Sequence, residues 1–154
     1  MISFRVRRKF LLVAGGILLA SLAFAWVAPN LLRWRLAEGE RTPAKELRLI
    51  DEAVKTYISK RGTAPPTLIA LRGHIPSEWS CGTPPCEHLG YRVQYTVLSQ
   101  DAGGPRYSLT AEPLQHGVTG VRSFYLDQSG VLRCTKEARA ATSNDSPLPD
   151  CGKP

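Results

Sequence analysis

The four cysteines are the residues whose type and spacing point most directly to chemistry. They lie in the second half of the 154-residue chain, at Cys81, Cys86, Cys134 and Cys151. An even number of cysteines behind an apolar leader favours an oxidising compartment and disulfide bonds. Of the three possible sets of pairs, we favour Cys81–Cys86, which closes the short loop CGTPPC, and Cys134–Cys151, which closes a loop near the C-terminus.

A zinc site is the competing interpretation of the same cysteines. Structural zinc sites use tight pairs of ligands. The spacing here is Cys-x4-Cys followed far away by Cys-x16-Cys, and prolines stand inside the first pair. Stapled loops fit this pattern better, so we predict disulfides and no metal.

The remaining chemistry-bearing residues form no recognisable active site. Ser80 and Ser129 lack a nucleophile-elbow motif and a base at a fixed offset. Asp127 begins the segment DQSG, which lacks the repeated carboxylates of a calcium loop, so a type I turn with a bulge is the simpler interpretation. The three histidines are His74, His88 and His116. They show no HxxxH or HExxH spacing, so we interpret them as surface residues. We therefore predict a protein that is not an enzyme and has no cofactor.

The basic residues are concentrated at the N-terminus. The formal charge is +7, yet four of the twenty bases fall within residues 5–9 and no acid precedes Glu38. A surplus of Lys and Arg beside an apolar run marks the cytoplasmic flank of a membrane segment. Nucleic-acid binding would need a basic stripe with aromatic or polar readers on the folded domain. The sequence shows no such stripe, so we expect no nucleic-acid partner.

Residues 10–28 (FLLVAGGILLASLAFAWVA) form an uncharged apolar run. As a helix this run would be about 28 Å long, close to the thickness of the hydrocarbon core of a bilayer. Trp26 and Trp34 lie near its outer end, where amphipathic rings prefer the interface. We predict a single-pass anchor with residues 1–9 in the cytoplasm and the chain after Pro29 on the other side.

A cleaved leader is the alternative to a retained anchor. Residues 23–25 (AFA) form an A-x-A pattern behind a basic and an apolar region, so a signal peptidase would cut after Ala25. Apolar character continues through Leu31 and Leu32, which favours the anchor. Both interpretations place the folded domain on the same side of the membrane.

Apolar residues recur with the period of a helix over residues 44–60. Residues 30–41 continue as a helix that leaves the membrane, and Pro43 weakens or kinks it. We therefore predict an amphipathic helix over 29–62 that continues from the membrane segment. The positions that recur at i, i+3, i+4 and i+7 and that we expect to pack on a sheet are Leu47, Ile50, Ala53, Val54, Tyr57 and Ile58.

Strand-like segments follow the helix. Residues 63–90 hold five of the twelve prolines and are predicted to form an irregular, partly stapled loop. A long helix followed by an antiparallel meander indicates an α+β fold with the helix on one face of the sheet. Residues 63–154 would form this loop and sheet domain. The predicted strands are Tyr91–Ser99, Arg106–Pro113, Ser123–Leu126 and Val131–Thr135, with turns at 101–105 and 127–130.

Both ends of the ordered chain resemble one protein family. Residues 28–57 (APNLLRWRLAEGERTPAKELRLIDEAVKTY) resemble the stretch of type IV pilins and type II secretion pseudopilins where the membrane helix leaves the bilayer. Residues 119–135 (TGVRSFYLDQSGVLRCT) are similar to a hairpin of one group of these proteins, and 143–148 (SNDSPL) to the ending of that group. The resemblance implies a pilin-like fold without catalysis, in the bacterial inner membrane, with the C-terminal domain in the periplasm or at the cell surface.

The prepilin peptidase site of this family is degenerate here. Family members carry a glycine before an aromatic residue and a glutamate four positions later, whereas Lys9 precedes Phe10 and Ala14 replaces the acid. In the family, this glutamate is buried in an apolar bundle and pairs with the N-terminal amine of the neighbouring subunit. Without the glutamate, this pairing between subunits cannot form. The resemblance also points to Asp145 and Asp150, because some pseudopilins bind calcium near their C-terminal loop. We expect no metal there.

Two hypotheses from different classes follow. The first is a structural or assembly protein whose partners are membrane lipid and other pilin-like subunits. Its helices would approach closely through a small-residue face formed by Gly15, Gly16 and Ala20. The second is a secreted or periplasmic binding module, released after Ala25, that recognises a ligand through the proline-rich loop. A small-molecule ligand is not expected under the first hypothesis.

Overall fold

The computed structural model describes residues 43–81, 85–101, 103–148 and 151. These residues all belong to one compact unit, Leu36–Pro154. Residues 1–42, with the predicted anchor and its small residues Gly15, Gly16 and Ala20, lie outside the described part, and so does Asp150. Within the described part, no helix combines the length and the apolar character that a membrane span requires.

One long helix is described over residues 43–61. It lies within the predicted helix over 29–62, of which residues 29–42 fall outside the described part. Leu47, Ile50 and Val54 are fully buried on one face, as the apolar period predicts. The helix ends at Gly62, whose φ is +73° and whose N–H donates to the carbonyl of Ile58 at 2.7 Å. This left-handed glycine is a common helix stop.

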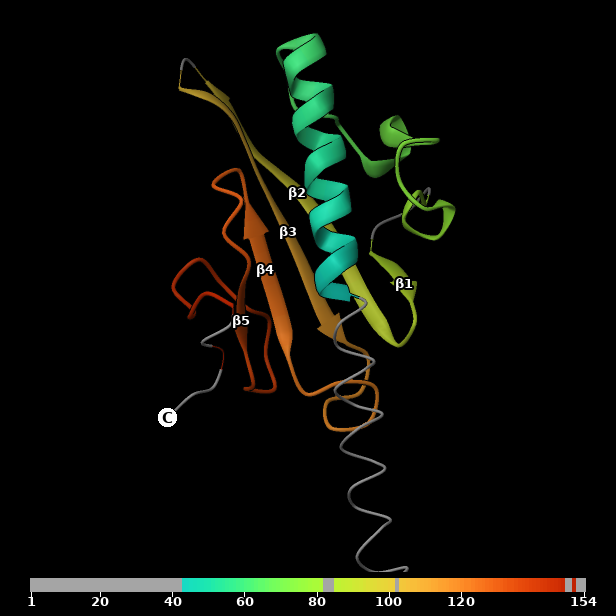
Figure 1. Cartoon of the computed structure of the whole chain (residues 1–154), viewed down its shortest axis with the longest axis vertical. Helices are drawn as coiled ribbons and strands as arrows, with labels where there is room; N and C mark the ends of the chain where they lie inside the picture. The colour runs from blue at the N-terminus through green and yellow to red at the C-terminus, as the bar shows by residue number, and fades with distance from the viewer. Residues whose placement is uncertain (1–42, 82–84, 102, 149–150, 152–154) are drawn as a thin grey trace, which may run out of the picture. The chain divides into compact units, whose positions relative to one another are not determined.

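The sheet is a five-stranded antiparallel meander, and the long helix lies across one of its faces (Figure 1). The spatial order of the strands equals their order in the sequence. The predicted α+β fold class is therefore confirmed for the described residues. The strands are β1 (Cys86–His88), β2 (Tyr91–Asp101), β3 (Gly104–Pro113), β4 (Ser123–Asp127) and β5 (Arg133–Thr135).

The core lies between the helix and the sheet. Tyr107, Leu109 and Ala111 alternate along β3 and are fully buried, because successive side chains of a strand point to opposite faces. Trp79 closes the core beside the helix and is also fully buried. Each large apolar side chain buried in this way contributes about 1.5–3 kcal/mol relative to exposure, so this layer holds the helix on the sheet.

The predicted irregular loop over 63–90 is partly wrong. It contains two 3-10 helices, η1 (Leu68–Leu71) and η2 (Ser77–Trp79), and the short strand β1. β1 pairs with the start of β2 through Cys86 opposite Val93 and His88 opposite Tyr91. The sequence did not predict this strand because it is only three residues long and because Leu89, in place of Asn, Asp or Gly, occupies the first position of its turn.

Strand ends differ by a few residues from those predicted. β2 and β3 extend to the tip of the hairpin, where Asp101 pairs with Gly104. The observed turn is therefore shorter than the predicted turn over 101–105. β5 begins at Arg133 instead of Val131. Leu132 lies before the strand and accepts a hydrogen bond from the backbone of Leu148 at 2.8 Å, which explains the later start.

Candidate functional site

A groove of about 390 Å³ lies between the helix and the segment around η1. The helix lines it with Leu49, Ala53 and Tyr57, which recur every four residues and therefore share one face. Ala70 and Leu71 line the other side. Leu49 was not part of the predicted apolar stripe and is 50% exposed. This off-stripe leucine is the one sequence signal for the groove.

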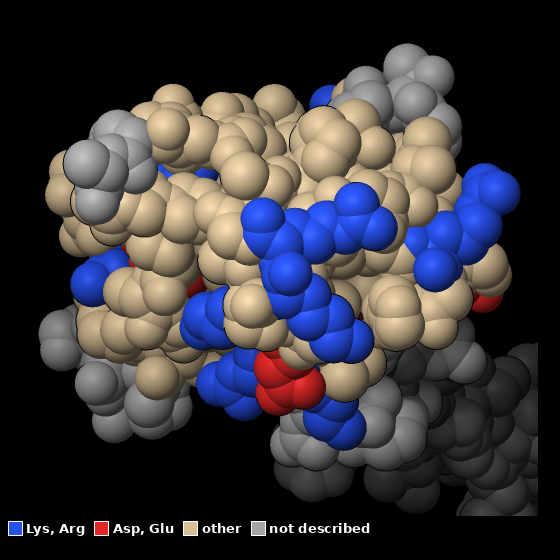
Figure 2. Space-filling model, turned by 90° about the horizontal axis from the view of Figure 1, so that it is seen from above, with Lys and Arg blue, Asp and Glu red and all other residues tan. Residues whose placement is uncertain are grey.

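Polar and charged side chains from the end of the helix and from the loop after η1 also line the groove. Lys60, Arg61 and His74 line it, and the Arg61 guanidinium lies 5.1 Å from the centre of the Tyr57 ring. Lys and Arg side chains gather on the face seen in Figure 2, which looks onto the domain from the upper end of Figure 1. Cations are favourable at a helix C-terminus. The groove thus combines apolar walls with two cations, Lys60 and Arg61, and one carboxylate, Glu52.

A buried carboxylate joins the helix to β3. Asp51 is 5% exposed. Its Oδ1 accepts a 2.5 Å hydrogen bond from the Tyr107 hydroxyl, and its Oδ2 accepts one of 2.8 Å from Lys55 Nζ. Burial, and then the hydrogen bond to Asp51, raises the pKa of Tyr107. Tyr107 therefore remains a hydrogen-bond donor, and its bond to Asp51 links the helix to the sheet.

Trp79 makes a second polar link to the helix. Its indole Nε1 donates to Glu46 Oε2 at 2.9 Å. Burial raises the pKa of Glu46, and the hydrogen bond from Trp79 opposes that rise. The His88 ring meets Trp79 edge-on, with 5.4 Å between ring centroids. Glu46 lies outside the predicted apolar stripe, yet it is half-buried. His88, which was predicted to be a surface residue, lies in β1 and is also half-buried.

The other predicted candidates for chemistry lie apart from one another. His74 is at the groove, and His116 is exposed with its Nε2 2.9 Å from the backbone oxygen of Lys136. Ser80 is buried and its hydroxyl has no hydrogen-bond partner. Ser129 belongs to the turn after β4, where its N–H donates to Asp127 Oδ1 at 2.9 Å. Across the described ranges, no three His, Cys, Asp or Glu side chains converge to hold a metal.

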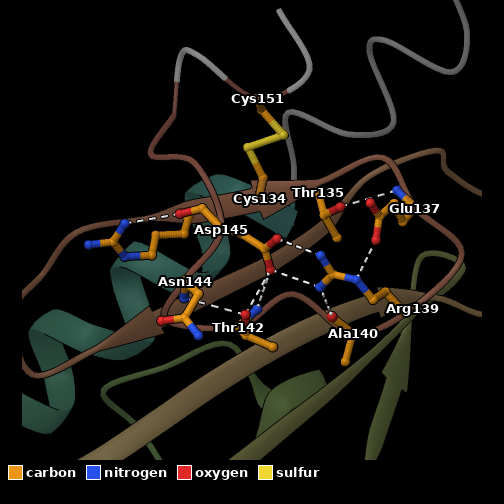
Figure 3. A network of polar contacts seen from close by, with 10 residues as sticks. Cys134, Thr135, Glu137, Arg139, Ala140, Thr142, Asn144, Asp145 and Cys151 are labelled. Atoms are coloured by element: carbon orange, nitrogen blue, oxygen red, sulfur yellow. Dashed lines mark hydrogen bonds and ion pairs between the residues drawn. A yellow bond between two sulfur atoms is a disulfide. The ribbon is translucent and has the colours of Figure 1, made fainter. Parts of the chain in front are cut away.

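The carboxylate of Asp145 is held by Arg139 in the C-terminal segment (Figure 3). Its Oδ1 accepts from Arg139 Nη2 at 2.6 Å, and its Oδ2 accepts from Nη1 at 2.9 Å and from the Thr142 N–H at 2.7 Å. The hydrogen bonds from Arg139 hold the pKa of Asp145 well below its usual range. The oxygens of Asp145 that the resemblance associated with calcium are thus already paired with a cation of the chain itself.

Both predicted disulfides are present. The Cα atoms are 5.8 Å apart in Cys81–Cys86 and 5.5 Å apart in Cys134–Cys151. The second bond fixes the end of the C-terminal segment to β5. The same segment is also bound through its backbone, because the Cys134 N–H donates to Ser146 at 3.0 Å. The polar tail is therefore folded back along the edge of the sheet.

No protein-family model, curated protein or solved structure matches the chain. The structure itself defines a small, disulfide-bonded α+β domain in which one helix covers a five-stranded antiparallel meander.

Proposed function

We propose that this chain is a membrane-anchored, pilin-like or pseudopilin-like protein without catalytic activity, which serves as a structural or assembly component of a type IV pilus or type II secretion-type system. Residues 10–28 would cross the bacterial inner membrane. The described domain would stand in the periplasm or at the cell surface.

The observation that carries this proposal is the position of the long helix. It follows the apolar N-terminal run in the sequence and buries Leu47, Ile50 and Val54 against an antiparallel meander. The resemblance at residues 28–57 and 119–135 implies this order of a helix before a meander. The hairpin of the second stretch corresponds to β4 and β5.

The disulfides support the proposed compartment. All four cysteines are paired, since the structure contains no free cysteine, and disulfides persist in the bacterial periplasm and outside cells. The buried polar groups support the absence of catalysis. Asp51, Tyr107 and Glu46 each hold a structural partner, and none of them faces the groove.

Other pilin-like subunits are the proposed partners, through the small-residue face at Gly15, Gly16 and Ala20. Bulk added to this face would prevent close approach of helices in lipid. We expect the double variant Gly15→Leu/Gly16→Leu to lose cross-linked oligomers in native membranes. Leu18→Phe, which adds bulk on the opposite side of the predicted helix, is the matched control and should keep them.

Mass spectrometry of the mature N-terminus tests the anchor. A chain that begins at Met1, or near residues 8–10, agrees with a retained membrane segment. A chain that begins at Trp26 shows removal by signal peptidase and contradicts the proposal.

A secreted or periplasmic binding module is the second candidate function, and the groove favours it. The groove has apolar walls, and its cations Lys60 and Arg61 outnumber its one carboxylate, Glu52. It would therefore suit an apolar ligand that carries an anionic group. Titration with a medium-chain fatty acid, followed by NMR shifts at residues 49–61, tests this candidate. Shifts that saturate in the wild type and vanish in Arg61→Gln would support it, and their absence would remove it.

A further inference from the structure

Three exposed apolar side chains lie on two adjacent segments at one end of the domain, and we call them the end patch: Leu89, Leu114 and Val118. Their exposed fractions are 59%, 40% and 68%. Leu89 lies in the turn between β1 and β2, and the other two lie in the loop after β3. The two segments touch, because the Leu114 N–H donates to the Gly90 carbonyl at 2.8 Å and a Cβ added at Gly90 would lie 2.8 Å from Thr119 Cβ.

Leu89 has an unusual backbone conformation. Its φ is +50°, and it is the one non-glycine residue with positive φ in the part of the chain that the structure describes. Two-residue turns with positive φ strongly prefer Asn, Asp or Gly at this position. Neither turn geometry nor core packing therefore explains an exposed leucine here. Strain of this kind gathers at functional contacts, which indicates a contact for the side chain outside the domain.

The end patch lies at the end of the domain where the long helix begins. Glu46, in the first turns of the helix, accepts a hydrogen bond from Trp79, and Trp79 meets the ring of His88, the neighbour of Leu89, edge-on. Figure 1 shows the start of the helix, the β1–β2 turn and the loop after β3 at the lower end. The tip of the β2–β3 hairpin and the last turn of the helix lie at the opposite end.

The proposed anchor places lipid near this end. The chain enters the described domain at this end, at residue 43, and fourteen residues, 29–42, connect it to the apolar run. A connection of this length allows this end of the domain to reach the bilayer surface. Residues 88–91 and 113–122 contain no Asp or Glu that anionic headgroups would repel. Glu87 and Glu112 directly precede these two segments, and Glu87 is paired with Arg92 at 2.9 Å. Apolar side chains on such loops gain free energy when they enter the headgroup region.

We propose that the end patch docks on the surface of the bilayer that holds the anchor, with Leu89 and Val118 inserted among the lipid headgroups. This inference rests on the proposed membrane anchor and adds a second, reversible lipid contact made by the folded domain. The contact would hold the domain close to the membrane and would have to break before the domain moves away from it.

Site-specific photo-cross-linking of the full chain tests this contact. The chain is inserted into vesicles of phosphatidylethanolamine and phosphatidylglycerol, with a photoreactive phenylalanine analogue at position 89 or 118. Positions 98 and 131 are matched controls, since Leu98 and Val131 are 53% and 38% exposed and lie toward the far end of the sheet. We expect several-fold more lipid adduct at 89 and 118 than at the controls.

A second pair of variants separates docking from folding. Leu89→Asn suits the left-handed turn, so the domain should keep its circular dichroism spectrum. Combined with Val118→Asn, it should lower the adduct from a probe at 114 several-fold, while Leu98→Asn should not.

The outcomes distinguish this inference from the function on which it rests. Equal adducts at all four positions, or adducts with a second copy of the chain, overturn the docking contact while the anchor stands. A chain that alkaline carbonate releases from the vesicles overturns both.

Discussion

Tyr107 on β3 and Asp51 in the long helix are joined by a hydrogen bond of 2.5 Å, although 56 residues separate them in the sequence. Lys55 binds the second oxygen of the same carboxylate at 2.8 Å. Burial of a carboxylate is tolerated only with such partners. The pair therefore fixes the position of the helix on the sheet more specifically than apolar packing alone.

Removal of the Tyr107 hydroxyl should destabilise the domain. Tyr107→Phe leaves Asp51 Oδ1 buried without this donor, and we expect the free energy of unfolding to fall by about 1–3 kcal/mol. Urea unfolding of the full chain in detergent, monitored by circular dichroism, measures this change in the free energy of unfolding. Tyr125→Phe is the control, because its hydroxyl lies 3.4 Å from Asp127 in a half-buried position. An equal loss in both variants would refute the special role of the pair.

The Arg139–Asp145 pair should make stability depend on acid pH. Because the pKa of Asp145 is lowered below its ordinary 3.8, the folded state holds that proton less tightly than the unfolded state. Its stabilising contribution is present above the ordinary pKa and is lost as the pH falls toward the lowered value. The wild type should therefore lose more unfolding free energy between about pH 5 and about pH 2 than Asp145→Asn does. Parallel curves would contradict this.

The two disulfides should differ in their effect on stability. They join cysteines 17 and 5 positions apart. Loop-closure entropy gives about 3 kcal/mol for the longer loop and about 2 kcal/mol for the shorter one. The double variant Cys134→Ser/Cys151→Ser should thus unfold at lower urea than Cys81→Ser/Cys86→Ser and should expose residues 138–148 to protease. The reverse order of midpoints would show that other contacts hold the tail.

Leu89→Asn should stabilise the domain, in contrast to most substitutions. Asn adopts the left-handed conformation more readily than a branched apolar residue, so we expect a gain of about 0.5–1 kcal/mol in the free energy of unfolding. Leu114→Asn, at a residue without positive φ, is the control and should give no gain. A loss at Leu89 would mean that its side chain stabilises the domain in a way that the turn geometry does not show.

The sequence predicted the helix and the meander well because both have strong periods. The predicted end of the helix at residue 62 lies one residue past the last helical residue, 61, and Leu47, Ile50 and Val54 face the core as expected. The turn after β4 was recognised because Gly130, with φ of +75°, follows an Asp and a Ser. Regular elements repeat their signal over many residues, so the period of apolar residues is enough to find them.

The contacts around the groove and at the end patch could not be predicted from the sequence. The groove joins Leu49 to Ala70, residues that belong to separate elements and have no shared period. β1 was missed because three residues carry too little signal and because Leu89 stands where Asn or Gly is usual. The Arg139–Asp145 pair lies in an irregular segment, where spacing gives no guide to which charges meet.

Membrane extraction combined with protease accessibility tests the central claim most directly. Native membranes are washed with alkaline carbonate, and intact spheroplasts are treated with protease. We expect the chain to remain in the membrane pellet, with its folded domain digested from outside and its basic N-terminus protected. A full-length chain in the soluble fraction, with Cys81, Cys86, Cys134 and Cys151 all reduced, would contradict the anchor and the proposed compartment.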